Sequence, residues 1–168
     1  SIGCIAEDSI NIGVSTPMVD LGSDTTICDG DTMSLDAGAG YVTYVWSEGS
    51  MSQMLTISQS GLYKVTVTDS IGCIAEDSIS IGVSTPMVDL GSDTTMCDGS
   101  SISLDAGSGY TSYLWSDTSM GQTLLVSQSG MYHLTVTDSI GCTAADSIQV
   151  NISTVSLTFD PDTLSYCN

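Results

Sequence analysis

The feature that most constrains this chain is an internal repeat. The segment that begins at Ser1 reappears at Ser70, and 51 of the 69 aligned positions are identical. A third copy begins at Ser139 and diverges after Val150. Self-similarity at a fixed period is typical of tandem modules, in which each period is one structural unit. The chain is therefore predicted to hold two full modules and parts of two others.

Two prolines set the phase of the repeat. The segment GVSTP ends at Pro17 and again at Pro86. The residue before a proline favours extended backbone, so this segment suits a short junction. The expected division, in chain order, is the last strand of a preceding module, two complete modules, and the start of a following module: 1–16, 17–85, 86–154 and 155–168.

Composition excludes several classes of partner. The 168 residues carry one Lys, no Arg and one His against twenty Asp and Glu, which gives a formal charge of −19. Such a chain cannot neutralise phosphates, so a nucleic-acid partner is excluded. No apolar stretch approaches the roughly 20 residues that a spanning helix needs, so membrane insertion is not expected. Because 41% of residues are hydrophobic, a folded core is still expected.

Alternation of apolar and polar residues in short runs, broken by Gly or Asp, predicts β-strands. The expected strands of the first complete module lie at about 18–21, 31–37, 42–47, 53–58, 62–69 and 75–83, with a short extra strand near residue 50. The positions expected to face the core are Met33, Leu35, Ala37, Tyr44, Trp46, Leu55, Ile57, Tyr63, Val65, Val67, Ile79, Ile81 and Val83, and their equivalents in the second module.

Two inward faces in a unit of this size indicate a β-sandwich, because a barrel with a lumen needs more chain. An immunoglobulin sandwich buries a Trp on its third strand and has a tyrosine corner at a later strand. Trp46 and Tyr63 match these positions, as do Trp115 and Tyr132. The predicted fold class is all-β, as tandem immunoglobulin-like β-sandwich modules. Val65 stands where the usual inter-sheet cysteine would follow the tyrosine.

The run from Val19 to Ile79 contains the motifs DTTIC, LDAG, YxWS, QSGxYxVTVTD and GC. These motifs resemble the immunoglobulin/PKD-like tandem modules of giant surface proteins in gliding, type IX-secreting bacteria. The resemblance covers nearly the whole chain. It implies an extracellular stalk, adhesin or filament protein and names no ligand.

Six cysteines at fixed spacing in small modules indicate disulfides and an oxidising, extracellular compartment. No C-x-x-C pair is present, which argues against zinc. The preferred pairing lies within modules: Cys28 with Cys73 and Cys97 with Cys142. Under it, Cys4 and Cys167 pair with modules outside the chain. A rival pairing uses all six cysteines and staples adjacent modules: Cys4 with Cys28, Cys73 with Cys97, and Cys142 with Cys167.

Acidic residues near the junctions predict a calcium site, because calcium prefers hard oxygen ligands from carboxylates and turn carbonyls. The candidate ligands are Asp20, Asp24, Asp29, Asp31, Asp69, Glu76 and Asp77. The alternative is that Asp beside Gly, Ser or Thr accepts local backbone hydrogen bonds and builds Asx turns. No DxDxDG loop is present, and no cofactor is expected to be required.

The family resemblance also gives meaning to a recurring tripeptide, in which Asp precedes Ser or Thr and then an aliphatic residue or Thr. Secreted proteins of these bacteria are similar in carrying O-linked glycans on such motifs. The candidate O-glycosylation sites are Ser9, Thr25, Thr32, Ser70, Ser78, Thr94, Ser139, Ser147 and Thr163. Local Asx and Ser/Thr turns are the alternative interpretation. The sequon that begins at Asn151 is a weaker, N-linked candidate.

No catalytic site is predicted. Lys64 and His133 occupy the same repeat position on an outward face, so they are interpreted as exposed surface. Loops of a few residues leave no mass for a substrate cleft, so an enzyme is not expected. Four residues lie near loops: Tyr41, Tyr110, Met51 and Met120. They either form a patch that contacts sugar or protein, or they cap the sandwich ends or pack against the neighbouring module; the second interpretation is preferred.

The favoured function is a structural spacer, in which modules stacked end to end each add a fixed length. Its expected partners are neighbouring modules of the same array. Two alternatives stay open: multivalent modules that bind carbohydrate or protein, and a fibre subunit that self-assembles by strand exchange. The copies are identical over 12–26 and 81–95, which favours a role in which junctions matter.

Overall fold

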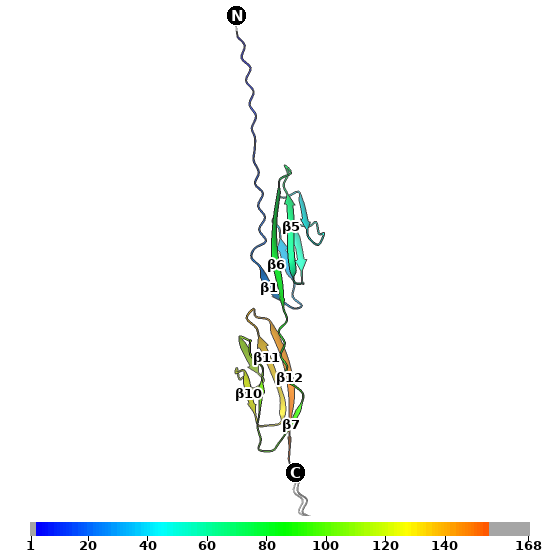
Figure 1. Cartoon of the computed structure of the whole chain (residues 1–168), viewed down its shortest axis with the longest axis vertical. Helices are drawn as coiled ribbons and strands as arrows, with labels where there is room; N and C mark the ends of the chain where they lie inside the picture. Colours follow the sequence, from blue (N-terminus) through cyan, green and yellow to red (C-terminus); the bar gives the residue numbers. More distant parts are fainter. Residues whose placement is uncertain (1–2, 155–168) are drawn as a thin grey trace, which may run out of the picture. The chain divides into compact units, whose positions relative to one another are not determined.

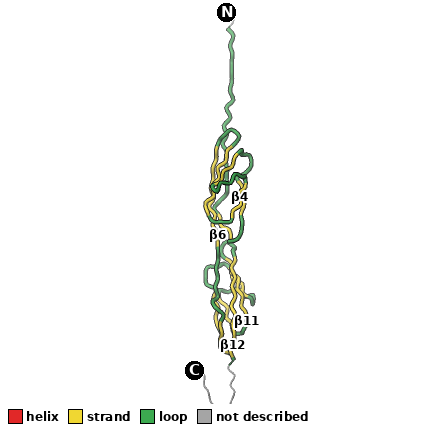
Figure 2. Tube along the Cα trace, turned by 90° about the vertical axis from the view of Figure 1, so that its right-hand side faces the viewer, coloured by secondary structure: helices red, strands yellow, loops and turns green. Residues whose placement is uncertain are grey.

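The computed structural model describes residues 3–154, and these residues form strands joined by turns and loops (Figure 2). They include no helix of the length and apolarity that crossing a membrane requires. The chain divides into two compact units, Ser1–Val83 and Ser84–Asn168.

Six strands build each unit, and each strand of the first unit has its repeat equivalent in the second. The strands of the first set are β1 (Thr25–Cys28), β2 (Met33–Asp36), β3 (Thr43–Trp46), β4 (Met54–Ile57), β5 (Gly61–Thr68) and β6 (Ile74–Ser84). Those of the second set are β7 (Thr94–Cys97), β8 (Ile102–Asp105), β9 (Ser112–Trp115), β10 (Thr123–Val126), β11 (Gly130–Thr137) and β12 (Thr143–Ser153).

Each set forms a four-stranded and a two-stranded sheet. The strand orders are β1-β6-β5-β3 with β2-β4, and β7-β12-β11-β9 with β10-β8. Figure 1 shows β5 beside β6, and β11 beside β12. In the second unit β12 pairs antiparallel with β11 and parallel with β7, so the first strand of the module lies along the end of its last strand.

The core of each unit lies between its two sheets, as the alternation of apolar residues predicts. Nine of the expected residues are buried together in the first unit: Leu35, Ala37, Trp46, Ile57, Tyr63, Val65, Val67, Ile79 and Ile81. Met33, Tyr44 and Leu55 pack against this cluster and are partly buried. Val83 is only partly buried. The immunoglobulin-like β-sandwich is thereby confirmed.

The two residues that indicated an immunoglobulin sandwich occupy the expected roles. Trp46 is 2% exposed, and its indole N–H donates to the carbonyl of Ser52 at 2.8 Å. The Tyr63 hydroxyl donates to the carbonyl of Gln59 at 2.9 Å, which is the geometry of a tyrosine corner. Val65, fully buried, fills the place of the missing cysteine.

Two strand predictions are wrong. Residues 18–21 form no strand; the first strand is β1 instead. Val19 and Leu21 pack on the core without a ladder, and the Leu21 N–H donates to Asp77 Oδ2 at 2.7 Å. The short strand expected near residue 50 is also absent. The Gly49 N–H donates to the carbonyl of Trp46 there, which makes a tight turn.

The turn that contains Gly49 has a threonine, Thr118, at the same place in the second unit, and the effect of this difference on stability can be tested. Gly49 has φ +88° and its repeat equivalent Thr118 has φ +71°. A β-branched residue in the left-handed region is disfavoured by about 1–2 kcal/mol, partly offset by the entropy that glycine loses on folding. We therefore expect Thr118→Gly to stabilise the second unit.

The reciprocal variant Gly49→Thr should destabilise the first unit by about 1 kcal/mol for the same reason. Urea unfolding of the two variants and the parent chain measures both effects. Changes of equal sign in the two variants would contradict this account of the turn.

Candidate functional site

The cysteines lie at the two ends of the last strand of each module. Cys97 ends β7 and pairs with Ser153, the last residue of β12, whereas Cys142 directly precedes the first residue of β12. At about 3.3 Å per residue, the strand separates these two cysteines by roughly 36 Å. A disulfide needs Cα atoms within about 7 Å, so these two cysteines cannot bond to each other.

The first unit repeats this arrangement. Cys28 ends β1, Cys73 precedes β6, and Thr26 lies against Gly82 near the far end of β6. Cys73 is therefore a strand length away from Cys28.

Both predicted cysteine pairings within the described residues are wrong. Cys28 and Cys142 are disulfide-bonded, whereas Cys4, Cys73 and Cys97 are free thiols. The preferred pairing fails because the two cysteines of one module lie at opposite ends of the same sandwich. The rival pairing fails for Cys4–Cys28 and Cys73–Cys97, because three of these four cysteines are free. Cys167, the proposed partner of Cys142 in that scheme, lies outside the described residues.

The loop before the last strand has the sequence Asp-Ser-Ile-Gly-Cys and is held by its own aspartate. Asp138 Oδ1 accepts the N–H groups of Ile140, Gly141 and Cys142 at 2.8–2.9 Å. Its other oxygen accepts the hydroxyl of Ser84 at 2.5 Å. This loop, called the DSIGC loop below, therefore fixes both its cysteine and the incoming chain at one end of the module.

The equivalent loop of the first unit keeps two of these three backbone bonds and the bond to the serine. Asp69 Oδ1 accepts the N–H groups of Ile71 and Cys73, and Asp69 Oδ2 accepts the hydroxyl of Ser15. The repeat therefore reproduces the loop together with its contact to the preceding segment.

The calcium candidates are spread over the first unit, and several act as hydrogen-bond acceptors. Asp20 and Asp69 accept backbone N–H groups two residues ahead, as Asx turns do. Asp24 accepts the N–H of Ser80, and Asp77 that of Leu21. The Asx-turn interpretation is confirmed at Asp20 and Asp69.

Glu76 pairs with Lys64, and Asp29 and Asp31 are exposed residues flanking the turn at Gly30. Among residues 3–154, no three His, Cys, Asp or Glu side chains are grouped as a metal site requires. Calcium binding stays a prediction.

The glycosylation candidates are accessible where the structure describes them. Those with exposed side chains are Ser9, Thr25, Thr32, Ser70, Ser78, Ser139 and Ser147, and Thr94 is partly buried. Asn151, of the N-linked sequon, is also exposed. Thr163 lies outside the described residues. Modification of these sites stays a prediction.

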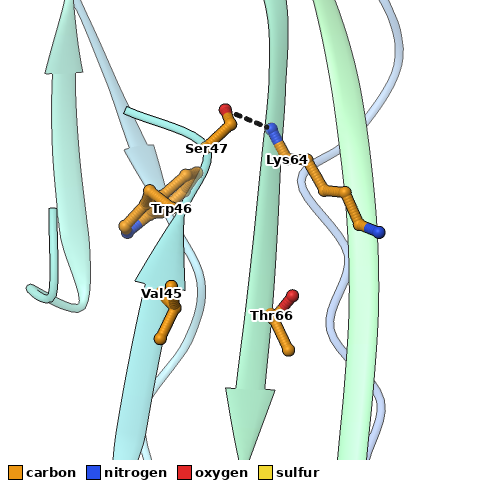
Figure 3. Close-up of a pocket in the computed structure, with 5 residues that line it drawn as sticks. All are labelled: Val45, Trp46, Ser47, Lys64 and Thr66. Atoms are coloured by element: carbon orange, nitrogen blue, oxygen red, sulfur yellow. Dashed lines mark hydrogen bonds between the residues drawn. The ribbon is translucent and has the colours of Figure 1, made fainter. Parts of the chain in front are cut away.

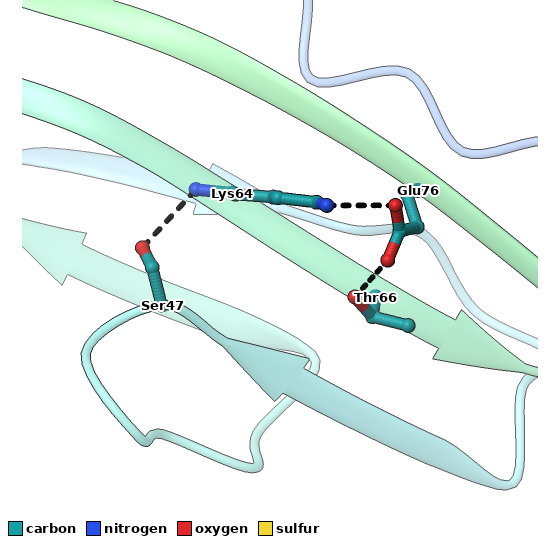
Figure 4. Close-up of polar contacts among 4 residues, drawn as sticks. All are labelled: Ser47, Lys64, Thr66 and Glu76. Carbon is teal, nitrogen blue, oxygen red and sulfur yellow. Dashed lines mark hydrogen bonds and ion pairs between the residues drawn. The ribbon is translucent and has the colours of Figure 1, made fainter.

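Lys64 lies on the outer face of β5 and forms the ion pair shown in Figure 4. Its Nζ lies 2.7 Å from Glu76 Oε2, and both side chains are about half exposed. Thr66 donates to the other carboxylate oxygen, and together these contacts hold the pKa of Glu76 below its ordinary value. An exposed pair of this kind contributes little to stability. His133 lies exposed at the equivalent place on β11, opposite Ser147.

Two shallow pockets flank edge strand β3. One, of about 160 Å³, is lined by Val45, Trp46, Ser47, Lys64 and Thr66 (Figure 3). It holds a single ion-paired amine and no nucleophile–base pair, so its geometry offers no assembled acid–base chemistry.

The second pocket, of about 370 Å³, is more apolar and is lined by Val42, Thr43, Tyr44, Val45 and Met51. Val42 and Met51 are largely exposed there. This apolar patch could contact a protein or sugar, because exposed apolar clusters mark such surfaces.

The tyrosines near the loops cap the sandwich, as preferred from the sequence. Tyr41 packs against the core and meets Tyr44 edge to face, with ring centroids 5.9 Å apart. Its hydroxyl donates to the carbonyl of Met18. Tyr110 repeats these contacts in the second unit.

Sequence reasoning missed the serine that docks on each DSIGC loop. Ser15 and Ser84 recur with the repeat, as do Asp69 and Asp138, at a constant separation of 54 residues. That recurrence was the available signal. The recurrence alone does not show that the serine contacts the aspartate, because that contact also depends on where the last strand lies.

No family model matches the chain, and a search of curated proteins finds no relative. Solved structures that the chain is similar to include the first two Ig domains of DIP-gamma, at 13% identity over 77% of this chain and 93% of that chain, with a TM-score of 0.46. The insect immune protein hemolin matches at 14% identity, over 79% of this chain and 46% of that one, with a TM-score of 0.43. Murine CEACAM1b matches at 13% identity, over 76% and 96%, with a TM-score of 0.38.

The DSIGC loop makes folding stability depend on pH. The Ser84 hydroxyl, and then the loop N–H groups, lower the pKa of Asp138 against the opposing effect of desolvation. A folded-state pKa below the unfolded value of about 3.9 adds stability above that pH. This stability is lost as the pH falls through the folded pKa.

Urea unfolding of the second unit between pH 7 and pH 2 should therefore show a smaller loss of stability for Asp138→Asn than for the parent chain. Asp98→Asn is the matched control, because Asp98 is exposed and its side chain holds no loop among the described residues. Parallel pH profiles for the parent and Asp138→Asn would contradict the role of this loop.

Proposed function

We propose that the chain is a non-catalytic segment of an extracellular tandem-repeat adhesin, where its modules act as spacers in a stalk or filament. The resemblance to surface proteins of gliding, type IX-secreting bacteria supports this proposal. So do the disulfide-bonded cysteines, because disulfides persist in oxidising compartments.

One observation carries the spacer function: the chain enters and leaves a module at opposite ends. In the second unit, Ser84 is bonded to the DSIGC loop at the start of β12, and the described strand ends at Ser153 beside Cys97. The eleven residues of β12 lie between these points, which advances the chain by about 36 Å at 3.3 Å per residue. Each module thus converts one repeat of sequence into one step of fixed length.

Multivalent binding is a second candidate because of the apolar patch on β3. The equivalents of Val45 and Met51 in the second unit are Leu114 and Met120, both at least half exposed. Weak sites repeated along an array gain avidity without strong individual contacts.

Fibre assembly by strand exchange is a third candidate. Residues 5–15 match the sequence of β6 except that Asn11 replaces Ser80. They form no strand, and Ile10 and Ile12 are at least 80% exposed where Ile79 and Ile81 are buried. An unpaired copy of a core strand can add to another module by strand pairing.

Spacer function predicts a linear relation between length and module number. We expect the maximum dimension from small-angle scattering to rise by about 36 Å or more for each added copy of residues 86–154. Val42→Ser with Met51→Ser should leave this increment unchanged, because neither residue belongs to β6 or β12, the strands whose length sets the advance of the chain. A maximum dimension that does not grow with added modules would contradict the spacer. Carbohydrate or protein binding that the patch variant abolishes would favour the second candidate.

A further inference from the structure

The segment that leads into the second unit runs alongside the last strand of that unit. This entry segment, residues 84–97, begins beside the DSIGC loop and ends with β7. Three hydrogen bonds follow its path: Ser84 with Asp138 at 2.5 Å, Leu90 with Asp146 at 2.7 Å, and Asp93 with Gln149 at 3.0 Å. Both partners advance toward the C-terminus together, so the entry segment and β12 run parallel.

The parallel run ends in a ladder between two strands. β7 pairs with β12 in parallel, with Thr94 opposite Val150 and Cys97 opposite Ser153 (Figure 1). One more hydrogen bond lies just beyond the ladder, from the N–H of Asp98 to the carbonyl of Ser153 at 3.2 Å. Contacts therefore join the entry segment to the last strand from the loop before that strand to its final residue.

The first unit has the same side-chain contacts. The equivalent pairs are Ser15 with Asp69, Leu21 with Asp77, and Asp24 with Ser80. An aspartate accepts in every one of these bonds, and hydrogen bonds to a carboxylate are stronger than those to a neutral acceptor. Attachment of the entry segment to the last strand is therefore a property of the repeat.

The last strand is itself fixed in the sandwich. β12 pairs with β11 over eight residues and buries Ile148 and Val150 in the core. The entry segment lies against this strand, and its Val88 and Leu90 add apolar contacts with the core. A pull on the chain therefore acts on the boundary between the entry segment and β12.

Tension along the chain loads this boundary in shear. It reaches the unit at Ser84 and leaves it after Ser153, and these residues lie at opposite ends of the parallel run. The two segments are then drawn along their lengths in opposite directions, so all the contacts are strained at once and must fail together. If both segments were pulled from one end, the contacts would break one after another, and each is individually weak.

We propose that the entry segment and the last strand form a tension clamp, which keeps each module folded when the array is stretched. All of its contacts in the second module lie within the unit Ser84–Asn168. The inference goes beyond the spacer proposal, on whose extended array it rests, because it explains how a module keeps its length under force.

The direction of pulling tests the clamp in the full chain. Azidophenylalanine replaces two exposed residues of the second unit, and DNA handles for optical tweezers are coupled to the azides. Handles at Thr85 and Ser153 pull the entry segment and β12 from opposite ends, whereas handles at Ser101 and Ser153 pull β7 and β12 from the same end. The chain is reduced after coupling, so that no disulfide shares the force. We expect the first pair of handles to need a severalfold higher unfolding force.

Both pairs of handles unfold the same unit, so a difference in force reports the direction of pulling. Equal unfolding forces for the two pairs, or a higher force for the pair at Ser101 and Ser153, would overturn the proposal.

Removal of one backbone donor tests the end of the clamp. Asp98 is the second residue of a turn in which the Ser100 N–H donates to the carbonyl of Cys97. Gly99 has φ +78°, as at the third position of a type II turn, and this type accepts proline at its second position. Asp98→Pro therefore keeps the turn and removes the N–H that donates to Ser153. Asp98→Ala is the matched control, because it removes the same side chain and keeps the N–H.

With the handles at Thr85 and Ser153, we expect a lower unfolding force for Asp98→Pro than for Asp98→Ala. Equal forces for these two variants would also overturn the clamp. Pulling and scattering separate the two proposals. A force that does not depend on direction, together with linear growth in length, would contradict the clamp alone, and a directional force without that growth would contradict the spacer alone.

Discussion

The last strand of each module is the element on which the rest of the structure depends. In the second unit, β12 pairs with β11 over eight residues and with β7 over four. It supplies Ile148 and Val150 to the core and presents Asp146 to the N–H of Leu90. Its length also sets the distance between the two cysteines. One strand thus fixes the core, the path of the chain and the placement of the two cysteines.

An excess of nineteen negative charges is tolerated because many carboxylates act as acceptors for the backbone. Asp138 and Asp69 each close a loop, and Asp146 and Asp77 each hold the segment that leads into the module. Charge-assisted hydrogen bonds of this kind are stronger than neutral ones. The acidic residues are therefore part of the folded architecture, and a metal ion is not needed to account for these contacts.

The alternation of apolar residues was sufficient to predict five strands and most of the core, because half-buried strands impose a period of two. The first strand was missed because Val19 and Leu21 are buried through a loop that is held by Asp77, and burial alone does not distinguish loop from strand. Disulfide pairing could not be predicted. Sequence spacing says nothing of spatial distance until the direction and length of the strand between the cysteines are known.

The sequence differences between the repeats fall at exposed positions more than at the positions that hold the fold together. Residues 70–84 and 139–153 differ at outward positions such as Glu76 and Ala145, but the cysteine of the DSIGC loop and the aspartate that holds the incoming segment are kept. Ile81 becomes Val150, so the core position stays apolar. Changes between the two full copies fall mainly between residues 27 and 65, whereas the DSIGC loop and the serine that docks on it are the same in both copies. Exposed positions thus vary while the loop and its docked serine are kept. The residues that determine where the chain enters and leaves a module are thus carried within each repeat.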